Sequence, residues 1–452
     1  MNKLLLVNPG AADKETYGAL EPFPVAYLAA LLQQHGYEVR ITDEMAGDDL
    51  KKDIKSFRPH IVGVSSTTPL IRRAYEILDY SRRKGALAVI GGPHASALPD
   101  EAARHADIVV VGDGEHAILD IAKGEVLSGV VKKPYTEDLN RLPYPARDLL
   151  RMDFYLNVRK IFPNHLFKFA PEGSKSASVL TTRGCPYRCI FCYNSWRRMP
   201  VRCRSVDNVL GELSLLKSEY GVDALQFADD ELFFDRKRAV ELFSRMKAEK
   251  FGFTWCACAR ANYVDLELLG MARDAGCKKI NIGFESGSQR ILDVLNKRTT
   301  VEQNRQAVEL CKKAGVQIGG YFIVGSPTET LEDIEMTRKF IKESAIDYVG
   351  LFVCTPLPGT EMYDKYADKS RAGPGLWEQL NFYDYVLPVN NVLSRETIER
   401  QYESLLTEIY GKREVNLGDV ILRHIKHPVY LAKKLINSPH KLTRLIKNVL
   451  ER

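Results

Sequence analysis

The sequence predicts an α/β protein with two parallel sheets: an N-terminal doubly wound, Rossmann-like domain, a partial (β/α)6 barrel, and a small, mostly helical C-terminal region. Short apolar runs alternate with helix-length segments twice along the chain, and a proline-rich stretch separates the two series. At 452 residues the chain also exceeds what one core usually fills. We therefore expect domains at 1–131, 176–375 and 376–452, with 132–175 as a linker.

The composition is that of a soluble globular protein, with 45% hydrophobic and 27% charged residues. No window reaches eighteen uninterrupted apolar residues, and the run Met1 to Val7 is too short for a signal peptide. The nine cysteines are an odd number, and three of them are clustered, which fits a reducing compartment better than a disulfide framework. These features predict a cytoplasmic protein.

The net charge of +6 lies entirely in the C-terminal tail. Residues 417–452 hold eight Lys or Arg against two acids, so residues 1–416 carry 56 charges of each sign. Leucine and isoleucine accompany these basic residues at helical spacing. Three interpretations stay open: docking at the inner membrane surface, binding of an anionic substrate, or a solvated helix packed on the body.

Five apolar runs in the first domain predict a parallel sheet: 3–8, 38–42, 61–65, 88–91 and 107–111. Helices are expected at about 24–35, 69–84 and 100–105. The carboxyl ends of these strands, where such sheets bind ligands, are small and polar. The candidate binding residues there are Asn8, Ser65, Ser66, Thr67, Gly91, Gly92, His94, Gly112, Gly114 and Glu115. We expect His94 on a loop, in polar contact with the edge of a large ligand.

A linker is predicted at about 132–148 because Pro134, Pro143 and Pro145 cannot lie inside a helix or a central strand.

The next segment holds Cys185, Cys189 and Cys192 at C-x3-C-x2-C spacing, directly after an apolar strand at 177–180. Three thiolates on one tight loop suit a [4Fe-4S] cluster whose fourth iron stays open for a substrate. The alternative is a zinc knuckle, but zinc needs a fourth ligand, and the nearest cysteine, Cys203, lies eleven residues further on.

Five further strands, at 224–228, 254–259, 279–284, 317–324 and 348–354, alternate with helices such as 206–220 and 236–247. With the strand before the cysteines they complete a (β/α)6 partial barrel, whose chemistry belongs at the strand carboxyl ends. The C-terminal region adds aromatic residues and a helix near 395–410, which is suited to closing the barrel mouth.

The motif formed by Cys185, Cys189, Phe191 and Cys192 resembles the signature of the radical S-adenosylmethionine (radical SAM) enzymes. The resemblance implies that the open iron chelates SAM and that Phe191 lies against its adenine. It places Asp229 and Asp230, with Glu231 less favoured, at the SAM amino group, and Glu285 at the ribose or amino group. Gly320 and Gly325 shape the adenine site. Arg260, at the end of its strand, is suited to the SAM carboxylate or to a surface ion pair.

Cys354 ends the last strand of the barrel and is our candidate for a catalytic side chain, against the alternative of a buried core cysteine.

The first domain resembles the cobalamin (B12)-binding domain that precedes the barrel in one subclass of radical SAM enzymes, on the segments GGPHAS and VVVGDGE. The motif Asp-x-His-x-x-Gly, which supplies a histidine to cobalt in other cobalamin proteins, is absent; Asp43 to Gly47 occupies the comparable place. Two interpretations follow: the domain holds cobalamin without histidine, or it has lost the cofactor.

The resemblance implies a cobalamin-dependent radical SAM enzyme, and the expected reaction is methyl transfer from methylcobalamin to an unactivated carbon of a lipid-like or other secondary-metabolite substrate. The alternatives are a cyclase or oxidoreductase with the same cofactors, and a non-enzymatic metal- or cobalamin-binding module. The expected partners are a small-molecule substrate and a reductant such as flavodoxin or ferredoxin. No nucleic acid is expected, and the basic tail suggests peripheral membrane contact.

Overall fold

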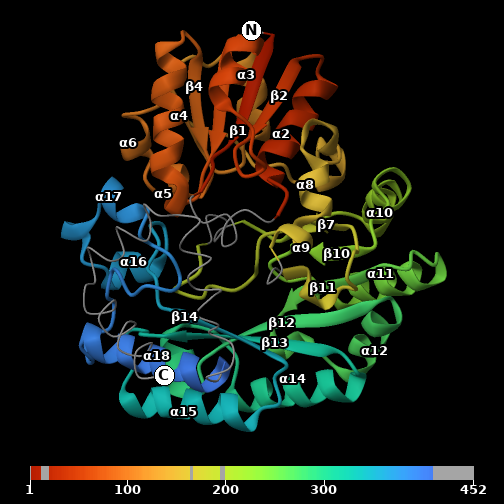
Figure 1. Cartoon of the computed structure of the whole chain (residues 1–452), viewed down its shortest axis with the longest axis vertical. Helices are drawn as coiled ribbons and strands as arrows, with labels where there is room; N and C mark the ends of the chain where they lie inside the picture. Colours follow the sequence, from red (N-terminus) through yellow and green to blue (C-terminus); the bar gives the residue numbers. More distant parts are fainter. Residues whose placement is uncertain (1, 12–19, 163–165, 194–198, 411–452) are drawn as a thin grey trace, which may run out of the picture. The chain divides into compact units, whose positions relative to one another are not determined.

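The N-terminal sheet is parallel throughout, with strands in the order β2-β1-β3-β4-β5-β6 (Figure 1). The computed structural model describes residues 2–11, 20–162, 166–193 and 199–410. The strands of this sheet are β1 (Lys3–Asn8), β2 (Glu38–Asp43), β3 (Ile61–Ser65), β4 (Leu87–Gly91), β5 (Ile108–Val111) and β6 (Gly129–Lys132). The strand order reverses at β1, so the carboxyl ends of β1 and β3 flank the switch point at which such sheets bind ligands.

Helices cover both faces of this sheet because successive side chains of each strand point to opposite sides. Leu4 and Leu6 share a core with α2 and α7, whereas Leu5 and Val7 share one with α3 and α4. The helices are α2 (Phe23–Gln34), α3 (Leu50–Phe57), α4 (Ile71–Arg83), α5 (Pro93–Ala97), α6 (Pro99–Ala102) and α7 (Glu115–Lys123). Burial on both faces explains the continuous apolar runs of the strands.

The five predicted strands are confirmed, and two features were missed. Strand β6 is an edge strand on which Val130 is 51% exposed, so it has no apolar run to reveal it. The expectation of a loop around His94 was wrong, because Pro93 begins the short helix α5. Proline suits the first turn of a helix, where its missing N–H is not needed.

The linker contains only short helices, and Pro134, Pro143 and Pro145 lie outside them. These helices are η2 (Leu139–Arg141), η3 (Arg147–Leu149), α8 (Met152–Leu156), α9 (Val158–Ile161) and η4 (Leu166–Phe169). Met152 and Tyr155 pack into the core of the N-terminal domain. The boundary proposed between 131 and 132 falls just before Lys132, the last residue of β6.

The second sheet is also parallel, in the order β14-β13-β12-β11-β10-β7. Its two edge strands, β7 and β14, do not pair with each other, so this is an open, partial barrel. The strands are β7 (Ser176–Val179), β10 (Ala224–Phe227), β11 (Thr254–Ala259), β12 (Cys277–Glu285), β13 (Gln317–Val324) and β14 (Tyr348–Val353). The helices between them are α10 (Val206–Tyr220), α11 (Arg236–Ala248), η5 (Ala261–Tyr263), α12 (Leu266–Asp274), α13 (Gln289–Val294), α14 (Val301–Ala314) and α15 (Leu331–Glu343).

The cysteine motif lies in the chain between two short strands that pair antiparallel, β8 (Thr182–Arg183) and β9 (Arg202–Cys203).

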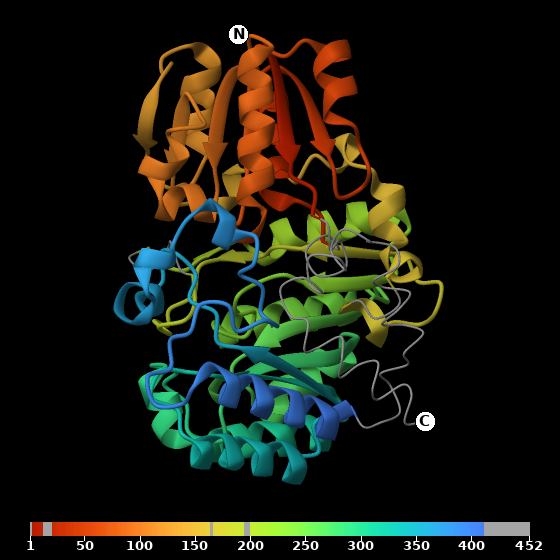
Figure 2. The ribbon, with the colours of Figure 1, turned by 60° about the vertical axis from the view of Figure 1, so that its left-hand side comes forward.

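The segment after β14 returns to the N-terminal domain, where α17 lies beside α4 (Figures 1 and 2). Trp377, Leu380 and Leu387 share a core with β1 and β3. The elements of this region are α16 (Glu361–Tyr366), η6 (Lys369–Arg371), α17 (Pro374–Trp377) and α18 (Arg395–Tyr410). The described residues up to Glu399 form one compact unit, and those from Arg400 to Tyr410 belong to a second. The basic tail lies outside the described residues, among which no helix is long and apolar enough to span a membrane.

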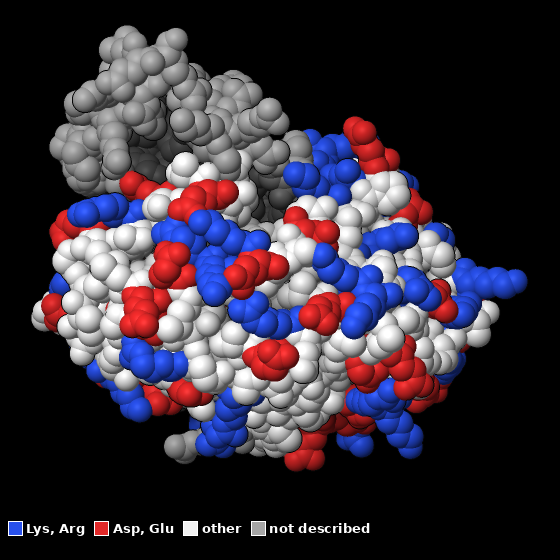
Figure 3. All heavy atoms as spheres, turned by 90° about the horizontal axis from the view of Figure 1, so that it is seen from below, with Lys and Arg blue, Asp and Glu red and all other residues white. Residues whose placement is uncertain are grey.

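The face drawn in Figure 3 carries basic and acidic side chains interspersed, rather than a stripe of one sign. Arg305 on α14 pairs with Glu343 on α15 at 3.4 Å, in keeping with the balanced charge of residues 1–416.

Candidate active site at the carboxyl ends of the two sheets

The three motif cysteines lie on one loop that follows β7 and β8, entered through Gly184 with φ of 94°. Burial raises the pKa of the Cys185 thiol. The protein around Cys192, with the charges of Asp230, Cys189 and Cys185, raises the pKa of that thiol to about 12. The described residues contain no group of three His, Cys, Asp or Glu already arranged to hold a metal ion. Three soft donors on one loop fit an iron–sulfur cluster, whose binding would displace their protons.

Asp229 organises the start of this loop. One carboxylate oxygen accepts hydrogen bonds from the backbone N–H groups of Thr181 and Thr182 and from the Thr182 hydroxyl; the other accepts from the Thr181 hydroxyl at 2.9 Å. The residue is 3% exposed. Because both oxygens are already engaged, the geometry favours a structural role for Asp229 in place of the SAM contact expected from the sequence.

The next two acids differ from Asp229 and from each other. Asp230 is exposed, yet the protein around it and the charge of Asp229 raise its pKa. Glu231 is buried; one oxygen accepts from the backbone N–H of Phe233 at 3.2 Å, and the other, Oε2, has no partner. Burial raises the pKa of Glu231 to about 8. An unpaired buried carboxylate oxygen is costly, so Glu231, the less favoured residue in the sequence, is the stronger candidate to meet a donor on a ligand.

Arg260 is buried against the cysteine loop, so it does not form the surface ion pair that was the alternative prediction. Its guanidinium is 3.5 Å from the ring centre of Tyr187 and donates to Cys189 Sγ at 3.6 Å and to the carbonyl of Lys297. Arg260 is 6% exposed, and its Nε has no partner. A buried cation beside a cluster ligand, with one donor unused, is consistent with the predicted carboxylate contact.

Glu285 ends β12 at φ of 61°, where the pairing with β13 is irregular. A residue other than glycine in this region is strained, and such strain concentrates at functional sites. Glu285 forms an ion pair of 2.7 Å with Lys297, and both side chains are less than 10% exposed. Lys297 was missed in the sequence because a lysine shortly after a helix usually lies on the surface.

The other predicted residues of the barrel have mainly packing roles. A Cβ at Gly320 would lie 2.9 Å from the Phe284 ring, and one at Gly325, with φ of 89°, would lie 2.8 Å from the Tyr385 ring. Phe191 is half-buried. Cys354 is 2% exposed, its thiol lies 3.1 Å from Met362 Sδ, and burial raises its pKa. This setting favours the core role for Cys354 over the catalytic one.

The predicted cobalamin residues do gather at one end of the N-terminal sheet. Gly92, with φ of 94°, brings β4 against β3: a Cβ there would lie 2.8 Å from the backbone nitrogen of Ser66. Asn8 donates to Asp43 at 2.9 Å, and Gly112 faces open space. The remaining members are Ser65, Thr67, Gly91 and Gly114. The open backbone at Gly112 suits the approach of a large ligand, whereas Gly92 serves the close packing of two loops.

Two predicted residues of this group are engaged by protein instead. The His94 side chain is 0% exposed; its Nδ1 lies 3.1 Å from the Thr68 hydroxyl and its Nε2 lies 3.3 Å from Glu101. Glu115 Oε1 accepts from Arg183 at 2.6 Å. This leaves His94 unsuited to reach the periphery of a cofactor.

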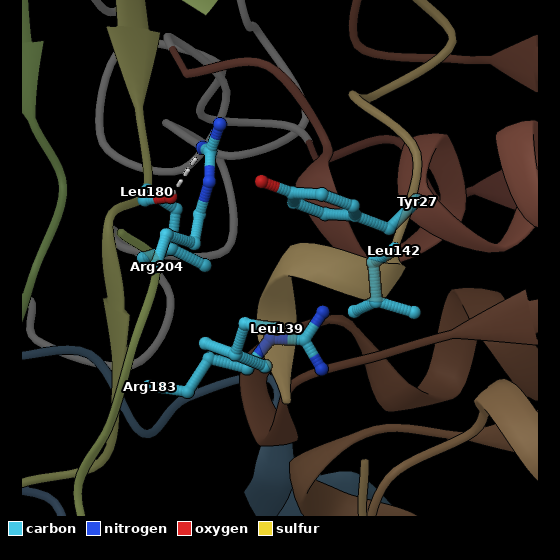
Figure 4. A pocket seen from close by; sticks show the side chains of 6 residues that line it. All are labelled: Tyr27, Leu139, Leu142, Leu180, Arg183 and Arg204. Carbon is cyan, nitrogen blue, oxygen red and sulfur yellow. Dashed lines mark hydrogen bonds between the residues drawn. The ribbon is translucent and has the colours of Figure 1, made fainter. Parts of the chain in front are cut away.

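Besides the Glu285–Lys297 pair, a buried cluster of Glu212, Arg147 and Arg204 joins the linker to the barrel. Glu212 of α10 accepts from Arg147 at 2.6 Å and also from Arg204, and all three side chains are less than 5% exposed. Beside it, Tyr27, Leu180, Arg183 and Arg204 line a cavity of about 10 Å³, where Arg204 donates to the Leu180 carbonyl (Figure 4). This cavity has room for about one water molecule and not for a cofactor.

The chain matches two family models: the radical SAM superfamily over residues 179–341 and the B12-binding domain over residues 12–122. It is 31% identical to the uncharacterized methyltransferase PH0819 of Pyrococcus horikoshii, over 93% of this chain and 95% of the relative. It is 27% identical to the anaerobic magnesium-protoporphyrin IX monomethyl ester cyclase of Rubrivivax gelatinosus (88% and 76% covered). It is 29% identical to the bacteriochlorophyllide d C-12(1)-methyltransferase of Chlorobaculum tepidum (94% and 89% covered).

The fold is similar to that of the radical S-adenosylmethionine methyltransferase TsrM of Kitasatospora setae, with a TM-score of 0.68 at 17% identity, over 89% of this chain and 91% of TsrM. A parallel partial barrel that carries a three-cysteine loop, preceded by a sheet that matches the B12-binding domain model, defines an enzyme of radical SAM chemistry. The chain belongs to the B12-binding radical SAM family. Its cofactors are a [4Fe-4S] cluster, SAM and cobalamin.

Proposed function

We propose that this enzyme transfers a methyl group to an unactivated carbon of a small molecule. The observation that carries the proposal is the near full-length match to a relative named as a methyltransferase, in a chain that retains both the cysteine loop and the B12-binding sheet. When bound, the cluster with SAM supplies a carbon radical and cobalamin carries the methyl group.

The residues of the chain have separable tasks in this proposal. Cys185, Cys189 and Cys192 hold the cluster. We place SAM beside Glu231, Arg260 and the Glu285–Lys297 ion pair, where the buried atoms Glu231 Oε2 and Arg260 Nε have no hydrogen-bond partner in the protein. Polar groups that are fixed in this way can bind and orient a zwitterionic ligand without reorganising. Phe191 and Asp230 complete this site, and Gly320 and Gly325 shape it by allowing the Phe284 and Tyr385 rings to pack against their backbone.

Cyclisation or oxidation with the same cofactors is the second candidate. The 27% identity to a monomethyl ester cyclase favours it.

The substrate that we propose is a lipid-like or other secondary metabolite. Two of the relatives reported above are named for a magnesium-protoporphyrin IX ester and for bacteriochlorophyllide d, and a substrate of that kind would be consistent with the proposal. A flavodoxin or ferredoxin would supply electrons. We further propose a cytoplasmic location with peripheral membrane contact through residues 417–452, supported by their eight basic residues.

The test uses the full-length enzyme, reconstituted without oxygen, with SAM labelled in its methyl group and an extract of cells that lack the gene. We expect S-adenosylhomocysteine together with a labelled small molecule detected by mass spectrometry. Deoxyadenosine and a new unlabelled product without S-adenosylhomocysteine would establish the cyclase or oxidoreductase alternative instead.

A further inference from the structure

The cysteine loop is bonded to the N-terminal domain at both of its ends. Arg183, two residues before Cys185, donates to Glu115 at 2.6 Å and lies 3.8 Å from Asp113. Tyr193, the residue after Cys192, donates its hydroxyl to the carbonyl of Pro93 at 2.7 Å. Both sets of partners belong to the predicted cobalamin loops, which follow β4 and β5.

The ion pairs of this contact are shielded from solvent. The Arg183 side chain is 15% exposed and that of Glu115 is 6% exposed. On the neighbouring strand β9, Arg202 donates to Asp113 at 2.6 Å, with exposures of 4% and 3%. Charge-assisted hydrogen bonds with this little solvent are stronger than surface pairs and are little weakened by salt.

The Tyr193 ring is also wedged in place. A Cβ at Gly359, which has φ of 84°, would lie 2.8 Å from the Tyr193 ring and 2.9 Å from Cβ of Ala97 on α5. The absence of a side chain at position 359 thus lets Tyr193 reach Pro93. Tyr193 therefore fits between the segment after β14 and the loop after β4, and its position depends on both.

We propose that Arg183 and Tyr193 are positioning residues that couple the cluster loop to the cobalamin loops, so that cobalamin binding and cluster retention strengthen each other. This inference rests on the proposed function. Methyl transfer requires the cluster and cobalamin to be held at a fixed distance and orientation in the same enzyme. Coupling between two binding sites is reciprocal and typically amounts to 5- to 150-fold. The Asp113 and Glu115 carboxylates bind the two arginines of this contact, and Glu115 Oε2 is left without a hydrogen-bond partner.

The test measures iron release from the reconstituted full-length enzyme to a chelator, with and without hydroxocobalamin, whose binding is followed separately by its absorbance. In the wild type we expect hydroxocobalamin to slow iron release roughly tenfold. In the double variant Arg183→Gln, Tyr193→Phe we expect hydroxocobalamin still to bind but the slowing to fall below roughly twofold. The matched control is Arg245→Gln, Tyr80→Phe, whose contacts lie within single domains, and it should behave like the wild type.

Equal slowing in the double variant would overturn the proposal, since cobalamin would then shield the cluster directly. A wild type that binds hydroxocobalamin with unchanged iron release would overturn it as well. If the double variant does not fold, the single variant Tyr193→Phe is used, because it keeps the ring and removes only the hydrogen bond to Pro93. We expect hydroxocobalamin to slow iron release from this variant less than from the wild type. Slowing equal to that of the wild type would refute the coupling. S-adenosylhomocysteine formation tests the proposed methyl transfer independently, so either idea can fail alone.

Discussion

Replacing Asp229 tests whether this acid supports the cysteine loop or binds SAM. In Asp229→Ala the backbone N–H groups of Thr181 and Thr182 lose their acceptor, in a site that is 3% exposed at Asp229 and 0% at Thr181. An unsatisfied buried donor costs about 1–3 kcal/mol, so two cost about 2–6 kcal/mol. We expect this cost to fall on the loop, because Asp229 accepts four hydrogen bonds from Thr181 and Thr182, the residues that lead into it.

The assay compares iron content after anaerobic reconstitution with SAM cleavage. We expect Asp229→Ala to retain little iron, whereas Asp229→Asn keeps an acceptor for both N–H groups and should retain both iron and SAM cleavage. An Asp229→Asn variant with a full cluster but no affinity for SAM would refute the structural role and restore the contact predicted from the sequence.

Three further predictions follow from buried charges and from the tail. Burial raises the pKa of Glu329 from 4.5 to about 8, so the folded state holds the extra proton and its stability should fall as pH rises from about 5 to about 8, by up to about 1.4 kcal/mol per pH unit. Glu329→Gln should remove this slope, and parallel unfolding midpoints of variant and wild type over that range would contradict it. Lys297→Met leaves the Glu285 carboxylate buried without its partner at 2.7 Å, a loss of about 3–5 kcal/mol; we expect weak SAM binding in a calorimetric titration, with Lys297→Arg closer to wild type. Truncation after Val415 should leave SAM cleavage intact and remove sedimentation with anionic vesicles at low salt. If the full-length protein does not sediment with such vesicles, the proposed membrane contact is wrong.

The sequence predicted the sheets well because most of their strands are buried runs of apolar residues. Lys3–Asn8 and Ile61–Ser65 were predicted to the residue, since a short apolar run bounded by turn residues is typical of a strand in the middle of a parallel sheet. An exposed edge strand such as β6 offers no such pattern. The cysteine loop was equally evident, because the chemistry of the ligands fixes both residue type and spacing.

The partners of the site residues could not be predicted, because they lie far away in the chain. Asp229 bonds to residues 47 and 48 positions earlier, and Glu115 meets Arg183 68 positions later. The run Asp229-Asp230-Glu231 does not reveal from the sequence that Asp229 binds backbone N–H groups while Glu231 has an oxygen without a partner. Lys297 and Tyr193 likewise have no motif of their own, and only the folded positions of Glu285 and Pro93 reveal what they do.

The most direct measurement of the central claim is the metal content and SAM chemistry of the enzyme purified and reconstituted without oxygen. We expect iron and sulfide for one [4Fe-4S] cluster, bound cobalamin, and formation of both deoxyadenosine and S-adenosylhomocysteine from SAM. Changing Cys185, Cys189 or Cys192 to Ala should abolish the cluster and deoxyadenosine formation together, since each removes a ligand that no neighbour replaces. A colourless protein with tightly bound zinc and no iron, or deoxyadenosine formed by any of the three variants, would contradict the account.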